Sequence, residues 1–456
     1  MLRKLQQPVD NAPLILFRIF FGLVFLFESL GSFYFGWINA NFVNVTHNFS
    51  FIGFEWLAFL NSEKMYIVFA LMAIASIMVT IGFKYRWAMF SLFILWGMVY
   101  FAQKTSYNNH YYLMWLITFI MLFLPANTYA SVDAKLNPKL RSLTTPRWTL
   151  TIFIVMISFV YGFATLAKFY PDWLDATVTR NMFLAIKKPE FLQPLFQKPS
   201  FHQFIAYAGI FFDGLIIPAL LFRRTRWFAI IASLIFHIFN SITLHIGVFP
   251  YFSLCFSIFF FKPEQIRAFF FRKKPQPTIE DLTYQPSSYD TILKYIIIPF
   301  ALIQFALPLR HWAIKGDVLW TEEGHRLSWR MMLRNRSGEA KFKVVDKNTK
   351  ETFIFDNSLL LNEKQRKRLN TSDVIWQMAQ KIKAYYALEN KEVEVYCHRS
   401  RISINGKSFR RYIDPTVDLT KEKWPYFKAA DWILEPNPPL KTFQEKVPLV
   451  HQPLQM

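Results

Sequence analysis

Cysteine is almost absent from this chain of 456 residues, which contains only two. Cys255 lies in an apolar stretch and Cys397 in a polar one, so the sequence predicts neither a disulfide framework nor a cysteine metal site, and the redox compartment stays open. The nine histidines show no metal-ligand spacing, and we expect no metal. We find no phosphate loop, dinucleotide fingerprint, serine–histidine nucleophile motif or internal repeat, which argues against the common nucleotide-binding and hydrolase classes.

Apolar residues are abundant instead. They make up 53% of the chain, aromatic residues make up 19%, and phenylalanine alone occurs 51 times. A helix needs about 20 apolar residues to cross the hydrocarbon core of a bilayer. The sequence therefore predicts a mainly α, polytopic transmembrane helix bundle of about nine spans, at 13–36, 65–83, 86–102, 110–126, 148–167, 203–222, 226–246, 248–262 and 292–309.

The composition changes near residue 311, where charged residues become frequent. The runs KFKVVD, TFIFD and VEVYCHRSRISIN are rich in β-branched and aromatic residues and predict strands. Helical spacing of apolar residues follows Thr371 and predicts a helix. We therefore expect two domains, the helix bundle in residues 1–310 and a small α+β domain in residues 311–456, preceded by a basic linker at 264–290.

The formal net charge is +21, which in a soluble protein would suggest nucleic acid as a partner. Here lysine and arginine cluster in short loops between apolar spans, so membrane orientation explains them and we expect no nucleic acid. A cytoplasmic N-terminus places sixteen of these cations inside and seven outside. The C-terminal domain is then extracytoplasmic, and anionic membrane lipids are the expected counter-charges.

Ionisable groups within or beside membrane spans are candidates for function. One alternative is structural: Arg18 and Glu28 would form a buried pair, Asp213 would pair with an arginine, and His237 would be a hydrogen-bonded core group. The remaining candidates of this kind are Lys104, His110, Lys168 and His245.

Lys168 stands at the predicted outer end of the fifth span, in TLAKFYPDW. A lysine at this depth commonly extends its ammonium group to the interface. The functional alternative is that burial disfavours the ammonium form, and the neutral amine then acts as a base. The residues alone leave both interpretations open.

The run KTSYNNHYYL at 104–113 places Asn108, Asn109 and His110 at one depth. This run is either an interfacial belt of polar and aromatic residues or part of a site. The predicted topology puts it on the same face as 168–173, 245–250 and the C-terminal domain, so these four regions are predicted to form one site.

Six motifs, in order along the chain, resemble the vitamin K-dependent γ-carboxylase family and its horizontally transferred transmembrane (HTTM) domain. They are FRIFFG (17–22), KTSYNNHYYL with ANTYASVDAKLN (126–137), AKFYPDW, FHIFNSITLHIGVFPY (236–251), LSWRMML (327–333) and ISINGKSFRRYIDPTVDL (402–419).

This resemblance implies a carbon–carbon lyase of the peptidyl-glutamate carboxylase type. In the family a lysine deprotonates reduced vitamin K, oxygen converts the quinol to a strongly basic alkoxide and then the epoxide, and carbon dioxide adds to the glutamate carbanion. By resemblance Lys168 is the base and His110 assists at the quinol. Contacts to quinol or substrate are expected from Asn108, Asn109, Asn240, Ser241, Trp329 and Asp414.

The chain also departs from the animal members of this family. It ends soon after WPYFKAADWIL, the two cysteines of the family disulfide have no counterpart, and GHR at 324–326 replaces a tyrosine-rich run. These differences suggest a bacterial inner-membrane relative that uses menaquinol. Three hypotheses remain: a quinol-dependent carboxylase of a glutamate-containing protein or peptide, a quinol epoxidase without carboxylation, and a non-catalytic transporter or scaffold.

Overall fold

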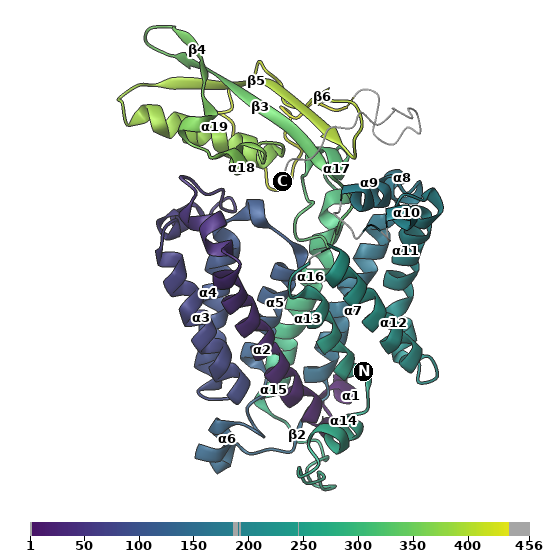
Figure 1. Ribbon diagram of the computed structural model, residues 1–456. Helices are drawn as coiled ribbons and strands as arrows, with labels where there is room; N and C mark the ends of the chain where they lie inside the picture. Colours follow the sequence, from purple (N-terminus) through teal and green to yellow (C-terminus); the bar gives the residue numbers. More distant parts are fainter. Residues whose placement is uncertain (1, 186–189, 191–192, 245, 437–456) are drawn as a thin grey trace. The chain divides into compact units, whose positions relative to one another are not determined.

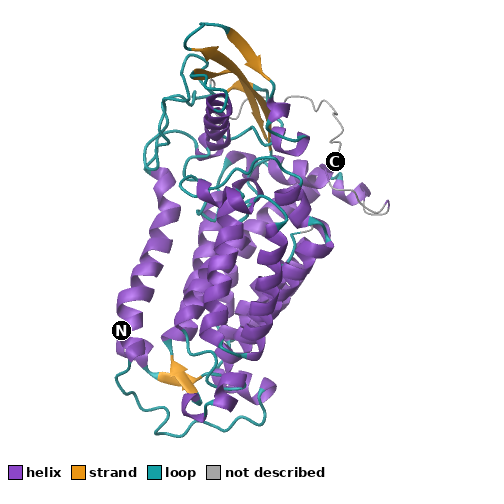
Figure 2. Cartoon of the chain, turned by 90° about the vertical axis from the view of Figure 1, so that its left-hand side faces the viewer, coloured by secondary structure: helices purple, strands orange, loops and turns teal. Residues whose placement is uncertain are grey.

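The computed structural model describes residues 2–185, 190, 193–244 and 246–436, so the candidate His245 lies outside the described residues. The chain divides into two compact units. The first unit comprises Met1–Asn44, Ser50–Gly162 and Phe212–Ala306, and the second comprises Val45–Phe49, Phe163–Phe211 and Leu307–Met456. Figure 2 shows that helices dominate and that strands gather in two separate places.

Nine apolar helical segments match the nine predicted spans (Figure 1). Seven are long and apolar enough to cross a membrane: α2 (Ala12–Tyr34), α3 (Lys64–Ile81), α4 (Tyr85–Ala102), α7 (Trp148–Lys168), α11 (Pro199–Leu221), α12 (Arg226–Leu244) and Ser288–Trp312, which contains α15 (Ser288–Ile292) and α16 (Ile298–Leu309). Two are shorter, α5 (Asn109–Phe123) and α13 (Phe249–Cys255) with its 3-10 extension Phe256–Phe260. The prediction of a multi-span, mainly α membrane protein is confirmed.

Buried ion pairs organise one end of the first unit. Strand β1 (Pro8–Asp10) pairs antiparallel with β2 (Thr144–Pro146). Asp10 accepts a hydrogen bond from Lys274 Nζ at 2.6 Å and forms an ion pair with Arg267 Nε at 2.9 Å. The segment predicted as a plain linker therefore begins with a helix, α14 (Pro263–Phe270), and is fixed by charge to the N-terminal strand. Removing either partner of a buried ion pair leaves the other charge uncompensated and destabilises the fold.

Arg18 and Glu28 are both buried, as predicted, but the alternative that they pair with each other is wrong. Ten residues along a helix correspond to about 15 Å. Arg18 instead donates to the carbonyl oxygens of Ala126 at 2.8 Å and Ala130 at 2.7 Å, and Glu28 accepts the Tyr111 hydroxyl at 2.6 Å. The arginine thus satisfies backbone carbonyls of the turn that follows α5.

The second unit contains an antiparallel sheet in the order β4-β3-β5-β6, with α19 (Ser372–Ala387) against it. The predicted strands and helix of the C-terminal domain are confirmed. Alternate residues of the strands face the core because side chains of a strand point to opposite faces. The strands are β3 (Arg336–Asp346), β4 (Thr352–Phe355), β5 (Val393–Ile404) and β6 (Arg410–Arg411), and the short helices are α8 (Pro171–Leu174), α9 (Thr177–Ala185), α10 (Gln193–Phe196), α17 (Val318–Thr321) and α18 (Glu363–Arg366).

A short segment from the loop between α2 and α3 completes the core of this domain. Phe49 is fully buried in one cluster with Phe342, Ile375 and Met378, which lie about 300 residues later in the chain. Beside it, His47 Nδ1 lies 3.2 Å from the carbonyl oxygen of Leu360. The core of the C-terminal domain therefore includes a residue from the N-terminal part of the chain.

Candidate functional site

Lys168 is the last residue of α7 and is 7% exposed. Its Nζ lies 5.2 Å from the centroid of the Trp173 ring, within the range of a cation–π or amine–aromatic contact. Trp173 is fixed from its other edge, because its indole N–H donates to the carbonyl oxygen of Ala206 at 2.9 Å. Gly209 of α11 leaves room there: a Cβ at this position would meet Trp173 Cζ2 at 3.4 Å and Lys168 Cε at 3.8 Å.

The surroundings of Lys168 are largely apolar. Ala167, Tyr170, Trp173, Ala206 and Ile210 belong to one buried cluster of the second unit. The chain turns sharply after α7 because Pro171 starts the short helix α8. This turn brings the Trp173 ring back toward the amine.

Asp172, next to Trp173, is 2% exposed and has both carboxylate oxygens occupied. It accepts Asn405 Nδ2 at 2.8 Å and Lys407 Nζ at 2.7 Å. Asn181 Nδ2 also donates to the carbonyl oxygen of Asn405, at 2.9 Å. The hairpin between β5 and β6 therefore holds α8 and α9, and through them the aromatic wall beside Lys168.

Residues 322–332, which include the LSW triplet, follow a strained path. Glu322, Leu327, Trp329 and Met332 all have left-handed backbone conformations, with φ between 55° and 66°. Such conformations are unfavourable for residues with a Cβ and gather at functional sites. Trp329, a predicted contact residue, is buried at 1% exposure on this segment.

Buried charges support that segment. Arg334 forms a two-pronged ion pair with Glu322, and Arg336 Nη1 lies 3.5 Å from the same carboxylate. Burial alone would raise the pKa of Glu322, but Arg334 above all, with Arg336, lowers it to about 2. Burial also holds the pKa of His325 well below its usual value. GHR at 324–326 thus contributes a neutral imidazole to an ionised cluster.

Tyr170 connects the Lys168 region to Asp317, the N-cap of the short helix α17 that ends just before Glu322. Its hydroxyl donates to Asp317 Oδ2 at 3.2 Å. Burial, together with the carboxylates of Asp317 and Asp172, raises the pKa of Tyr170, which keeps the phenol protonated. Asp414, another predicted contact residue, binds its own turn instead: its Oδ1 accepts Thr416 N at 2.9 Å and Thr416 Oγ1 at 2.6 Å.

The first unit contains His110 in the first turn of α5. Its ring centroid is 5.4 Å from that of Phe249, and the ring of His237 lies 6.0 Å from the same phenylalanine. His237 is 2% exposed, and a hydrogen bond of 2.9 Å joins its Nε2 to the Tyr161 hydroxyl. His237 is therefore a hydrogen-bonded histidine, and its ring and that of His110 both contact Phe249.

The predicted asparagines and serine lie near these histidines on α5 and α12. Asn108 caps α5 by accepting Tyr111 N at 2.9 Å, and Asn109 accepts the Tyr107 hydroxyl at 2.8 Å. Asn240 and Ser241 follow His237 by three and four residues, which places them on its side of the helix. Both asparagines of the 104–113 run thus have structural roles in addition to any role in binding.

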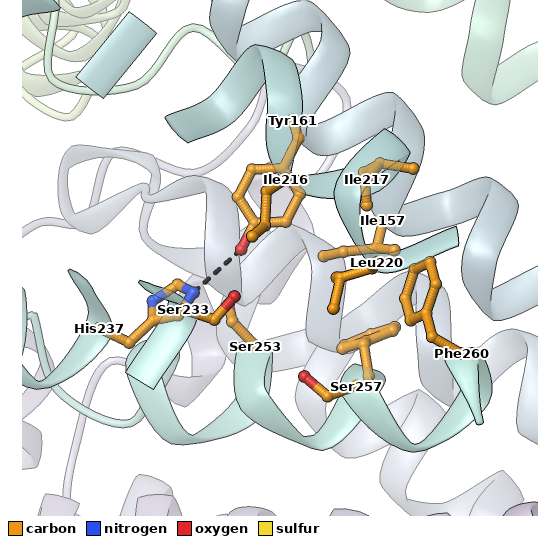
Figure 3. Close-up of a pocket in the computed structure, with 11 residues that line it drawn as sticks. Ile157, Tyr161, Ile216, Ile217, Leu220, Ser233, His237, Ser253, Ser257 and Phe260 are labelled. Atoms are coloured by element: carbon orange, nitrogen blue, oxygen red, sulfur yellow. Dashed lines mark hydrogen bonds between the residues drawn. The ribbon is translucent and has the colours of Figure 1, made fainter. Parts of the chain in front are cut away.

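A small cavity lies beside His237, lined by the hydroxyl groups of Ser233, Ser253 and Ser257 (Figure 3). The Tyr161–His237 hydrogen bond forms one end and Phe260 the other, with isoleucine and leucine side chains between them. Its volume is about 10 Å³ measured as space for the centre of a water molecule. This is enough for about one water and is far smaller than a naphthoquinone ring.

The structure brings together two pairs of the four regions predicted to form one site. Lys168–Trp173 and the C-terminal domain meet through Asp172 and Lys407, and His110 meets the 246–250 segment through Phe249. The sequence analysis missed Tyr161 and Asp172. Asp172 could have been singled out, because it lies in the family motif AKFYPDW. Tyr161 could not, because a tyrosine inside an apolar span is not distinctive.

Comparison with known families divides the chain in two. An HTTM domain model matches residues 6–264, and a model of the vitamin K-dependent gamma-carboxylase lumenal domain matches residues 289–438. No solved structure matches.

Proposed function

Because the chain belongs to the HTTM and vitamin K-dependent gamma-carboxylase family, we propose that it couples oxidation of a reduced naphthoquinone to carboxylation of glutamate side chains. In such an enzyme the quinol and oxygen supply the base strength needed to remove a γ-proton, and carbon dioxide adds to the resulting carbanion. The naphthoquinone epoxide, γ-carboxyglutamate and water are the products. In this proposal the quinol is vitamin K or menaquinol, and no metal takes part.

The environment of Lys168 carries the proposal. A buried amine beside an indole ring, with an apolar cluster next to it, suits a flat, apolar ligand that presents a hydroxyl group. The neutral form of an amine is the one that accepts a proton. We assign to Lys168 the deprotonation of the quinol hydroxyl.

His110 is proposed to assist by donating or accepting a hydrogen bond at the same ligand. Asn109, Asn240, Ser241 and Trp329 are proposed as further contacts. Asp414, whose carboxylate already binds Thr416, and Asn108, which caps α5, are the weakest of the proposed contacts.

The C-terminal region is extracytoplasmic, as the match to a lumenal domain indicates. We further propose that the N-terminus is cytoplasmic and that the membrane is the inner membrane of a bacterium, so that the C-terminal domain lies in the periplasm. The cationic loops then face anionic lipid headgroups on the cytoplasmic side.

A coupled assay tests the function. The full chain, purified in detergent, is supplied with reduced naphthoquinone, oxygen, labelled bicarbonate and a glutamate-containing peptide, and both epoxide and fixed label are measured. We expect both products from the natural protein and neither from Lys168→Ala. His110→Ala is expected to slow both by about a hundredfold, the usual contribution of one acid–base group.

Lys198→Ala is the matched control, because it removes an exposed lysine of the same unit. Thermal unfolding of each variant shows whether the fold is intact. Epoxide without label would identify an epoxidase that does not carboxylate. Absence of both products from folded natural protein, with several quinones tried, would favour a non-catalytic protein, and full activity of Lys168→Ala would rule out the proposed base.

A further inference from the structure

The four-stranded sheet has one covered and one open face. Figure 1 shows α19 along one face, and residues such as Phe342 and Val395 point into that core. The opposite face is formed by the alternate residues of the strands. We call this the basic sheet face, and its charged and aromatic polar members are Glu339, Lys341, Lys343, Glu394, Tyr396, Arg399, Arg401 and Arg411.

Cations dominate this face and lie directly opposite one another. Lys341 pairs in register with Arg399, and Arg401 pairs with Arg411. Like charges at directly opposed positions destabilise a sheet, so folding does not explain them. Negative charge on an outside partner would offset this repulsion.

Few carboxylates of the chain neutralise the face. Glu339 forms an ion pair with Arg399 at 3.2 Å, and Lys343 lies 4.8 Å from the centroid of the Tyr396 ring. Lys341, Arg401 and Arg411 are exposed, and none of them has an ion pair among the residues the structure describes. Three cations are therefore available to a ligand.

The basic sheet face is continuous with the hairpin that holds Asp172. Strand β5 runs from Arg399 and Arg401 into Asn405, and Lys407 follows in the turn before β6. Asn405 and Lys407 bind Asp172, which adjoins Trp173 beside Lys168. All these residues belong to the second unit, so the cations and the candidate base are parts of one body.

We propose that the basic sheet face binds an acidic stretch of the glutamate-containing polypeptide substrate. This inference rests on the proposed function and adds the partner's chemistry to it. Of the five cations on this face, Arg399, Arg401 and Arg411 are arginines, whose guanidinium groups match the two oxygens of a carboxylate. A membrane surface fits less well, because among the described residues of this face only Ile354 is a strongly exposed large apolar side chain.

Binding is measured without quinol or turnover, so the result does not depend on catalysis. The probe is a fluorescent synthetic peptide rich in glutamate. The control peptide, its twin, has the same sequence with every glutamate replaced by glutamine. Fluorescence anisotropy with the full chain in a neutral detergent gives the Kd. We expect the glutamate peptide to bind more tightly than its twin and more weakly as salt increases.

The double variant Lys341→Glu, Arg401→Glu tests the face itself. Its control, Lys364→Glu with Arg366→Glu, makes the same change in net charge on exposed residues of α18, which lies outside this face. We expect the Kd to rise about tenfold in the first variant and to be unchanged in the second, as for loss of a few exposed charge pairs.

Equal weakening by both variants would mean that net charge alone is responsible and would overturn the proposal. Unchanged binding by the first variant would overturn it as well. The proposal would also be overturned if the protein did not bind the peptide but bound vesicles containing phosphatidylglycerol, and if this vesicle binding required Lys341 and Arg401. Peptide binding that depends on the face in a protein that makes no carboxylated product would contradict the proposed function alone.

Discussion

The ammonium of Lys407 lies 2.7 Å from the carboxylate of Asp172, although 235 residues separate them along the chain. Asp172 is almost fully buried, and Lys407 is partly exposed. The pair links the hairpin of the C-terminal domain to the turn that presents Trp173 to Lys168. The position of the candidate base therefore depends on a contact made by the last third of the sequence.

Replacing Asp172 tests this dependence. In Asp172→Ala the buried amide of Asn405 loses its acceptor, which is expected to lower the free energy of unfolding by about 1–3 kcal/mol. Epoxide formation should fall more than peptide binding, because Trp173 loses its support. Asp431→Ala, which removes an exposed carboxylate of the same unit, should match the natural protein in both measurements.

Gly209 gives a graded test of the space beside Lys168. Gly209→Ala is expected to keep activity, because its Cβ meets Trp173 and Lys168 at ordinary contact distances. Gly209→Leu is expected to displace one of them and reduce the rate of epoxide formation at least tenfold, an energy typical of overpacking. Equal rates for the alanine and leucine variants would show that this contact is not needed.

The ionised cluster at Glu322 predicts a pH dependence of stability. The pKa of Glu322 is lowered to about 2 in the folded protein, from about 4.5 in the unfolded chain. Its contribution to the free energy of unfolding is therefore fully present above about pH 4.5 and is lost as the pH falls toward 2. Thermal unfolding between pH 3 and 7 measures this loss. Glu322→Gln should remove that part of the pH dependence and, at pH 7, destabilise the fold by roughly 3–5 kcal/mol through unpaired arginines.

Phe49 is expected to stabilise a domain that begins more than 250 residues after it. Phe49→Ala removes a fully buried ring and should lower the free energy of unfolding by about 3–5 kcal/mol. Phe35→Ala, at an exposed position near the end of α2, is the control. Limited proteolysis of the C-terminal domain distinguishes the two, since only the first variant should be cut faster.

The sequence predicted the local features of the fold well. Apolar length located all nine helical segments, and runs of β-branched and aromatic residues located β3, β4 and β5, because these properties are set by neighbouring residues. Pairings between distant residues were not accessible in this way. Arg18 was assigned to Glu28 because both are ionisable, whereas the arginine satisfies carbonyl oxygens of a turn more than 100 residues away.

The candidate site was predicted in part. Family motifs singled out Lys168 and His110, and the structure gives the first a buried aromatic environment and the second a contact with Phe249. Tyr161 and the Asp172–Lys407 pair could not be predicted, since their partners are fixed by packing rather than by spacing.

The burial of Phe49 in the C-terminal domain also bears on whether the chain crosses the membrane an even or an odd number of times. Phe49, the Lys168–Trp173 turn and the C-terminal domain belong to one compact unit, and we propose that they share one side of the bilayer. The chain must then cross an even number of times between Phe49 and Lys168, and again between Lys168 and the domain. The long helices supply three crossings in each interval: α3, α4 and α7 in the first, and α11, α12 and α16 in the second.

Each interval therefore needs one more crossing, and the short apolar helices α5 and α13 are the segments that provide it. Neither reaches the usual length of about 20 residues, so both must cross with the help of their flanking segments or through a locally thinner membrane. With α2 the total is nine, an odd number. In this proposed topology, the first residues of the chain and its C-terminal domain face opposite compartments.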